Sequence, residues 1–94
     1  MADTPQVVHD PAAGRLEMRT EIGTAELQYT RAGDTIDLVH THVPPALEGR
    51  GFASALARAA LDYARGEHLK VIPTCPFVRG YLRRHPEYSD LVAA

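Results

Sequence analysis

The sequence predicts an α+β fold: a mixed, mainly antiparallel five-stranded sheet with two main helices. In the first half of the chain, polar and apolar residues alternate in short runs separated by tight turns, as in an antiparallel meander. In the second half, an amphipathic helical segment leads to a short apolar run and then to a second helical segment. A strand–helix–strand connection of this length usually returns parallel, so the fifth strand is expected to be parallel to the fourth.

Four runs in the first half are predicted as strands because their residues alternate between polar and apolar. The predicted strands are 6–10, 15–19, 24–30 and 35–43. Strict alternation along the fourth run predicts two faces. One face holds Ile36, Leu38, His40 and His42, and the other holds Val39, Thr41 and Val43. Two prolines follow, and normal pairing should stop there because proline cannot donate a ladder hydrogen bond.

A helix is predicted over 51–65, because apolar residues recur at helical spacing and charged residues fall on the other side. The apolar stripe consists of Phe52, Leu56, Ala59, Ala60 and Tyr63, and the outward residues are Arg58, Asp62 and Arg65. Residues 69–72 are predicted as a short, largely buried strand. Pro76 fits the first turn of a second helix over 76–84.

Length and composition limit the function. Ninety-four residues predict one domain spanning 1–94. A net charge of −2 without a basic stripe argues against a nucleic-acid binder. The N-terminus lacks the features of a signal peptide, and no apolar run approaches the roughly 20 residues that span a membrane. A single cysteine fits a reducing compartment, so we expect a cytoplasmic protein with no membrane contact.

The turn between the fourth strand and the first helix carries the strongest functional signal. Gly49 and Gly51 flank Arg50 at the start of the helix. Amides at a helix start lack intrahelical acceptors and lie at the positive end of the dipole, so they favour a bound anion. Glycine also lets a phosphate approach the main chain closely. The sequence therefore predicts a site for a phosphate-bearing ligand.

In this turn the chain resembles the GCN5-related N-acetyltransferases. The signature of that family is Gln/Arg-x-x-Gly-x-Gly/Ala, placed between a strand and a helix. It aligns with residues 48–53, where Gly51 and Ala53 match and Glu48 does not. A carboxylate at the first position is unfavourable beside a pyrophosphate unless it points to solvent.

Two further features resemble a very short, uncharacterised, acetyltransferase-like subgroup of this family. One is a His-Thr-x-Val-Pro run, here residues 40–44, and the other is a lone cysteine after the next strand, here Cys75. The combined pattern covers roughly 23–92. It implies a minimal version of the family's fold that acts as one acetyl-CoA-binding domain.

The resemblance implies acetyl-CoA as the co-substrate, with no metal. The residues expected to hold the pyrophosphate through their amides are Gly49, Arg50, Gly51, Phe52 and Ala53. The pantetheine arm is expected against the backbone near His42 and Val43, where the fourth strand splays from the fifth. The prolines after Val43 lead to the same place, because they expose backbone groups with which an amide-rich chain could pair.

Acetyl transfer needs a neutral amine, and an imidazole that titrates near pH 7 is a suitable general base. His40 is the preferred candidate because it occupies the motif position of the subgroup. His42 is the alternate candidate. The competing interpretation of His40 is a polar strand residue satisfied by its neighbours.

Cys75 precedes Pro76 and is expected to be the N-cap of the second helix, where the dipole lowers the pKa of a thiol. The resemblance places this cysteine near the acetyl group. Three roles stay open: an acyl-carrying nucleophile, a proton donor to the departing CoA, or a wall of the acetyl pocket. The competing interpretation is a small buried residue at a strand end.

The chain departs from ordinary family members in two respects. Many of them protonate the thiolate with a tyrosine of the last helix, and alignment on Cys75 puts Leu82 at that position, so the general acid is unassigned. Ordinary members also carry two helices between the first two strands, where this chain has only residues 11–14. The acceptor side is therefore open, completed by a partner subunit in a homodimer, or suited to a large substrate.

The primary prediction is an acetyl-CoA-dependent N-acetyltransferase. Its acceptor is an amine of unknown identity, on a small molecule or on a protein. The alternative is a binding module that retains acetyl-CoA or CoA as a sensed ligand or a partner-docking cofactor, with little turnover. The absence of a tyrosine at the position of Leu82, together with Glu48, favours the alternative. His40 together with Cys75 favours the enzyme.

Overall fold

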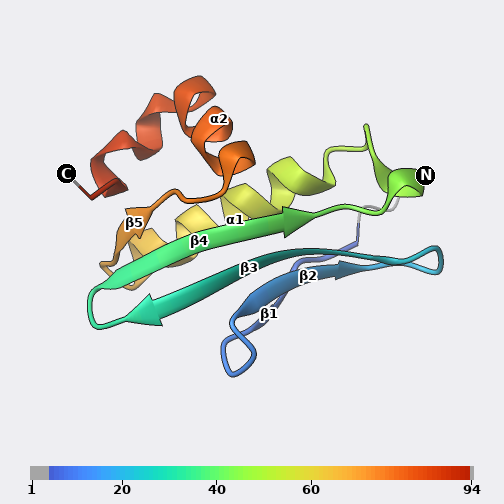
Figure 1. Cartoon of the computed structure of the whole chain (residues 1–94), viewed down its shortest axis with the longest axis horizontal. Coiled ribbons are helices and arrows are strands. Elements are labelled where there is room, and N and C mark those ends of the chain that lie inside the picture. Colours follow the sequence, from blue (N-terminus) through green and yellow to red (C-terminus); the bar gives the residue numbers. More distant parts are fainter. Residues whose placement is uncertain (1–4, 94) are drawn as a thin grey trace.

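The computed structural model describes residues 5–93, which form one five-stranded sheet with two α-helices and two short 3₁₀ helices (Figure 1). The strands are β1 (Val8–Asp10), β2 (Arg15–Arg19), β3 (Thr24–Ala32), β4 (Thr35–His42) and β5 (Lys70–Ile72). The helices are α1 (Phe52–Gly66), α2 (Pro76–Arg84), η1 (Pro45–Leu47) and η2 (Pro86–Leu91).

The strands lie in the order β1-β2-β3-β4-β5. The first four pair antiparallel, and β5 pairs parallel to β4 after the crossover through α1. The predicted α+β fold and its mixed sheet are thereby confirmed. The strand β1 is shorter than the predicted 6–10, and β3 runs two residues beyond the predicted 24–30.

Helix α1 covers one face of the sheet and contacts four of its strands, β2 to β5. Its buried residues are Phe52, Leu56, Ala57, Ala60, Leu61 and Ala64, so the buried stripe lies close to the predicted one. Alanines at three of these positions let the helix approach the strands closely. Helix α2 packs against α1 and η2, and Val78 and Tyr81 complete the core.

The other face of the sheet is polar. In the middle of β2, Glu17 is 7% exposed, and its carboxylate accepts hydrogen bonds from Arg15 and Arg19 on either side of it. We call this side, which α1 does not cover, the open face. It carries the side chains that alternate with the buried ones along β2, β3 and β4.

A β-bulge in β4 corrects the predicted faces of that strand. Gln28 pairs with His40 and Tyr29 with Leu38, which leaves Val39 without a partner residue in β3. Such an extra residue shifts the alternation by one position. Ile36 and Leu38 therefore face α1 as predicted, but beyond the bulge this face continues with Thr41.

The same shift moves the histidines of β4 away from the helices. His40 pairs with Gln28, which is exposed, and His42 pairs with Glu26. Paired residues point to the same side of a sheet, so both histidines lie on the open face. The prediction that His40 and His42 share a face with Ile36 and Leu38 is wrong, because the alternation of residues along one strand does not reveal a bulge.

Strand β5 pairs with β4 along its whole length, but β4 is much longer. Their paired residues are Thr35 to Asp37 in β4, whereas β4 continues to His42. One further backbone bond follows, from the Cys75 N–H to the carbonyl of Leu38 at 2.8 Å. Beyond Leu38, the edge of β4 has no strand partner on the β5 side within residues 5–93. Because β5 ends at Ile72, the last part of β4 has no neighbouring strand on this side among the described residues.

Candidate functional site

The segment from β4 to α1 builds a turn of unusual backbone conformation. Pro44 and Pro45 end the pairing of β4, and η1 follows directly. Gly49 and Gly51 then adopt φ values of 80° and 81°, in the left-handed region that only glycine enters without strain. A Cβ atom added to either glycine would meet nothing within 4 Å, so the space above both residues is open.

The start of α1 presents a row of amides without partners. The first bond of the helix runs from the Ala55 N–H to the Gly51 carbonyl at 3.0 Å, and no side chain caps the helix. Residues 5–93 provide no hydrogen-bond acceptor for the amides of residues 49–54. Because α1 spans 15 residues, its dipole adds a positive potential at this end. The arrangement can bind an anion such as a phosphate group.

A cavity of about 550 Å³ lies between this turn and the end of β4. Its lining comes from 41–43 in and after β4, 47–49 in the turn, 51–54 at the start of α1, and Phe77 in α2. The cavity thus extends from the unpaired amides to the end of β4 that has no neighbouring strand on the β5 side in the part of the chain described. A ligand with a phosphate at one end and an extended polar chain could occupy both parts.

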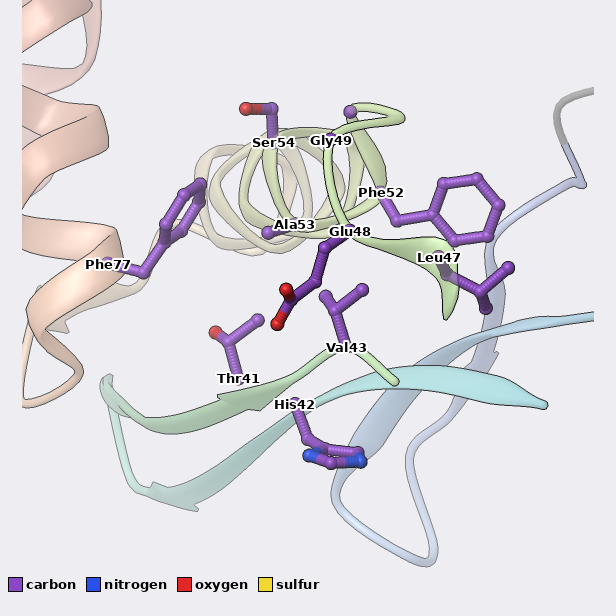
Figure 2. Close-up of a pocket in the computed structure, with 11 residues that line it drawn as sticks. Thr41, His42, Val43, Leu47, Glu48, Gly49, Phe52, Ala53, Ser54 and Phe77 are labelled. Carbon is purple, nitrogen blue, oxygen red and sulfur yellow. The ribbon is translucent and has the colours of Figure 1, made fainter. Parts of the chain in front are cut away.

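Figure 2 shows how the lining side chains lie. Thr41 and Val43 point into the cavity, whereas His42 points to the opposite side of the strand and contributes only its backbone. Phe77 reaches in from α2 and faces the first turn of α1. The bulge at Val39 sets this orientation, because it moves Thr41 to the face that α1 covers.

The carboxylate of Glu48 points into the cavity, toward Thr41 (Figure 2). Among the lining residues it carries the one formal charge when His42 is neutral. The cavity therefore combines a negative side chain with backbone amides that favour anions. Arg50 is exposed and its side chain is not part of the lining.

Cys75 lies next to the cavity but outside its lining. It is 4% exposed and is the N-cap residue of α2. Its Sγ atom is 3.3 Å from Thr41 Oγ1, within hydrogen-bond distance. Burial by itself raises the pKa of the Cys75 thiol. Hydrogen bonds from the Thr41 side chain and from the backbone N–H groups of Val78, Phe77 and Thr41 outweigh burial, so this pKa is lowered.

The structure does not bring the two predicted catalytic residues together. Cys75 is buried on the side of the sheet that the helices cover, and His40 is exposed on the open face. His42 also points to the open face, although its backbone lines the cavity (Figure 2). Cys75 and the two histidine side chains therefore lie on opposite faces of β4.

Two tyrosines of the C-terminal segment are directed elsewhere. Tyr88 donates a hydrogen bond to Asp62 at 2.6 Å, and this bond, together with burial, raises its pKa. Tyr81 is buried and stacks on His85 with ring centroids 4.0 Å apart. Neither side chain lines the cavity.

Five lining residues were not predicted as binding residues: Thr41, Leu47, Glu48, Ser54 and Phe77. Thr41 lies inside the His-Thr-x-Val-Pro run, so its place in that run was a usable signal. No sequence pattern distinguishes Phe77 from a core residue. In the part of the chain that the structure covers, no group of three or more metal-ligating side chains converges. Within the same part, neither α-helix has the length and apolar character needed to cross a membrane.

Comparison with known proteins identifies similar chains. Residues 15–91 match the model of the family described as GCN5-related N-acetyl-transferase. Protein NATD1 of Gallus gallus is 40% identical over 84 residues, which cover 86% of this chain and 76% of that protein. Protein NATD1 of Xenopus tropicalis is 44% identical and that of Homo sapiens 46% identical, each over 63 residues. These two matches cover 66% of this chain but only 58% and 56% of the relatives.

A solved structure shows the same fold. The NMR structure of a GCN5-like protein from Staphylococcus aureus superposes with a TM-score of 0.75. The match covers 99% of this chain and 92% of that one, at 24% sequence identity. At this identity the likeness is evidence about architecture.

Proposed function

Because the chain belongs to the GCN5-related N-acetyltransferase family, we propose that it binds acetyl-CoA in the cavity and transfers the acetyl group to an amine. The observation that carries the proposal is the row of unpaired amides at residues 49–54, which opens into the gap beside β4. In this proposal the whole chain acts as one acetyl-CoA-binding domain, located in the cytoplasm.

The amides from Gly49 to Ala53 hold the pyrophosphate in this proposal. The two left-handed glycines leave space above the main chain, so a phosphate oxygen can reach several N–H groups at once. The Arg50 side chain, outside the lining, contributes its charge from solvent. The pantetheine arm then follows the backbone at His42 and Val43, along the edge of β4 that lacks a strand partner.

The acceptor amine approaches from the open face. Helices α1 and α2 cover the side that holds the cofactor, and only the short turn between β1 and β2 stands where larger family members carry helices. His40, or His42 as the alternate, lies on this face and serves as the general base. The open surface suits an amine on a large molecule, or a surface that a second subunit completes.

A second function, a CoA-binding module with little turnover, is favoured by one observation. The Glu48 carboxylate points into the cavity and opposes a polyanionic cofactor. Binding and turnover separate the two functions. Calorimetric titration with acetyl-CoA and with CoA measures binding, and release of free thiol in the presence of a panel of amines measures turnover.

A pair of glycine variants makes the binding test specific to the turn. Gly51→Ala places a Cβ in the open space and strains a residue at φ 81°, at a cost of about 1–2 kcal/mol. We expect it to weaken binding of acetyl-CoA by about tenfold or more. Gly66→Ala, at the other end of α1, meets nothing within 4 Å and is the control. Absence of acetyl-CoA binding to the unsubstituted protein overturns both functions. An equal loss of affinity in the two variants overturns the assignment of the pyrophosphate to the amides of this turn.

A further inference from the structure

Thr41 is the link between the cavity and the buried cysteine. Its side chain points into the cavity (Figure 2). Its hydroxyl lies 3.3 Å from the Cys75 sulfur. Cys75 itself is 4% exposed and does not line the cavity. A group bound in the cavity therefore reaches the thiol through the Thr41 hydroxyl. The His-Thr-x-Val-Pro run includes this threonine but does not by itself give it a role.

We propose that Thr41 is a catalytic residue that protonates the departing CoA thiolate, and that Cys75 stands behind it as the source of the proton. The proposal rests on the proposed function, since it needs an acetyl thioester in the cavity. It assigns the general acid, for which Leu82 stands at the position of the usual tyrosine. The two tyrosines nearby in the sequence, Tyr81 and Tyr88, do not line the cavity.

The proposed step is the departure of CoA from the tetrahedral intermediate. The amine nitrogen has bonded to the acetyl carbon, and the bond from that carbon to the CoA sulfur breaks with its electron pair on sulfur. The Thr41 hydroxyl proton passes to this sulfur, and the Cys75 thiol proton passes to the threonine oxygen. CoA leaves as a thiol and Cys75 is left as a thiolate. Water then returns a proton to Cys75, while the proton lost by the amine goes to a base on the open face.

The surroundings of Cys75 suit a proton donor. A thiolate at this position is stabilised by the Thr41 hydroxyl and by N–H groups of Val78, Phe77 and Thr41, and the pKa of the Cys75 thiol is lowered in spite of burial. A thiol with a lowered pKa gives its proton readily to a thiolate of ordinary basicity such as that of CoA. Ionisable groups near the pair are the Glu48 carboxylate in the cavity and the Arg79 guanidinium, which donates hydrogen bonds to the carbonyls of Pro73 and Thr74 just before Cys75. Across β4 lie the two histidines of the open face.

Cys75 does not line the cavity, and the Thr41 side chain lies between its sulfur and a thioester bound there. The thiol is therefore not placed for direct attack on the thioester. Acyl transfer to sulfur would require Thr41 to move aside, whereas a relay uses both side chains where they lie. The two schemes differ in the importance of the threonine hydroxyl. A direct nucleophile does not need it for bond formation, and the relay does.

The test compares Thr41→Val, which removes the hydroxyl at nearly constant shape, with Thr41→Ser, which keeps it. Each full-length variant is assayed for CoA release from acetyl-CoA with hydroxylamine as the amine, and for CoA affinity by calorimetry. We expect Thr41→Val to lower kcat about 100-fold, the lower range for a general acid, with little change in the Kd of CoA. Thr41→Ser should stay within about tenfold of the unsubstituted protein.

A second readout follows the thiol directly. The rate of Cys75 alkylation by iodoacetamide is measured against pH in the unsubstituted protein and in both variants. Thr41→Val should shift this profile to higher pH because the thiolate loses a hydrogen bond, and Thr41→Ser should shift it little. If Thr41→Val does not fold, Cys75→Ala provides the same comparison of kcat, since it removes the source of the proton.

The measured kcat values, acetyl-CoA binding and alkylation profiles either support or overturn the relay. A kcat in Thr41→Val or in Cys75→Ala equal to that of the unsubstituted protein overturns the proposal. Normal binding of acetyl-CoA without CoA release also overturns it, although the cofactor site of the proposed function then stands. If acetyl-CoA does not bind at all, the proposed function fails first. A loss of kcat in Thr41→Val that Thr41→Ser restores, with the shifted alkylation profile, supports the relay.

Discussion

His40 and Cys75 lie on opposite sides of strand β4, although both residues adjoin the same stretch of its edge. His40 pairs with Gln28 on the open face, and Cys75 reaches Thr41 on the face that the helices cover. A thioester at this edge would therefore have a base on one side and a proton source on the other. Acetyl transfer can use both groups, because the amine loses a proton while the departing sulfur gains one.

The first prediction concerns the base. His40→Gln removes the imidazole that serves as the base in the proposed function but keeps a polar side chain on the open face. We therefore expect kcat to fall about 100-fold while CoA affinity stays unchanged. Gln28→Ala, which alters the paired position in β3, is the control. Loss of rate in His42→Gln but not in His40→Gln would assign the base to the alternate histidine.

The second prediction concerns the carboxylate in the cavity. Glu48→Gln keeps the shape of the side chain and removes the negative charge that faces the cavity. We expect CoA to bind more tightly by about fivefold, because a charge at this range in a partly solvated cavity opposes an anion by roughly 1 kcal/mol. The gain should shrink as salt is added, since added ions screen the repulsion.

The matched control for that charge change is Glu67→Gln, at the far end of α1, where the carboxylate contacts Arg31. Both variants change the net charge of −2 by one unit. Equal tightening in the two would indicate a general effect of net charge. Unchanged or weaker affinity in Glu48→Gln would show that the carboxylate leaves the cavity, or binds an N–H group of the cofactor, when CoA enters.

The third prediction concerns stability and pH. A hydrogen bond from Arg19, followed by the charges of Arg15 and Arg19, lowers the pKa of Glu17 below 4.5 against the opposing effect of burial. A lowered pKa in the folded state means that the unfolded chain takes up the proton first as pH falls. Glu17 therefore stabilises the fold above about pH 4.5, and this contribution is lost as pH falls through the folded pKa.

Glu17→Gln should accordingly lower the free energy of unfolding at pH 7, and the difference from the unsubstituted protein should shrink toward pH 3. Urea unfolding at both pH values measures it. Glu21→Gln, at an exposed position in the turn after β2, is the control and should change little. A difference for Glu17→Gln that is the same at pH 7 and pH 3 would refute the ionic contribution and leave only packing.

Local sequence patterns predicted much of this molecule. The alternating runs predicted the meander, and the helical spacing after Gly51 predicted α1 and the parallel return of β5. The prolines at 44 and 45 and the two glycines located the cavity, because the conformations they impose are local. These features depend on residues adjacent in the chain, so a single sequence suffices to find them.

What the sequence could not predict depends on contacts between distant segments. The register shift opposite Gln28 is a property of the β3–β4 pair, so the faces of β4 beyond Val39 came out reversed. Phe77 joined the cavity only because α2 packs beside α1. The bond between Thr41 and Cys75 joins positions 34 residues apart, and no local pattern specifies it.

The unpaired residue Val39 decides which half of the β4 sequence faces inward. If the alternation ran through Val39 without a bulge, Thr41 would turn outward and both histidines would turn toward the hydrophobic interior. Excision of Val39 would instead keep the present faces, because His40 would then follow Leu38 directly in the alternation. Loss of this residue should therefore leave Thr41 facing inward, and its exposed side chain is free to vary.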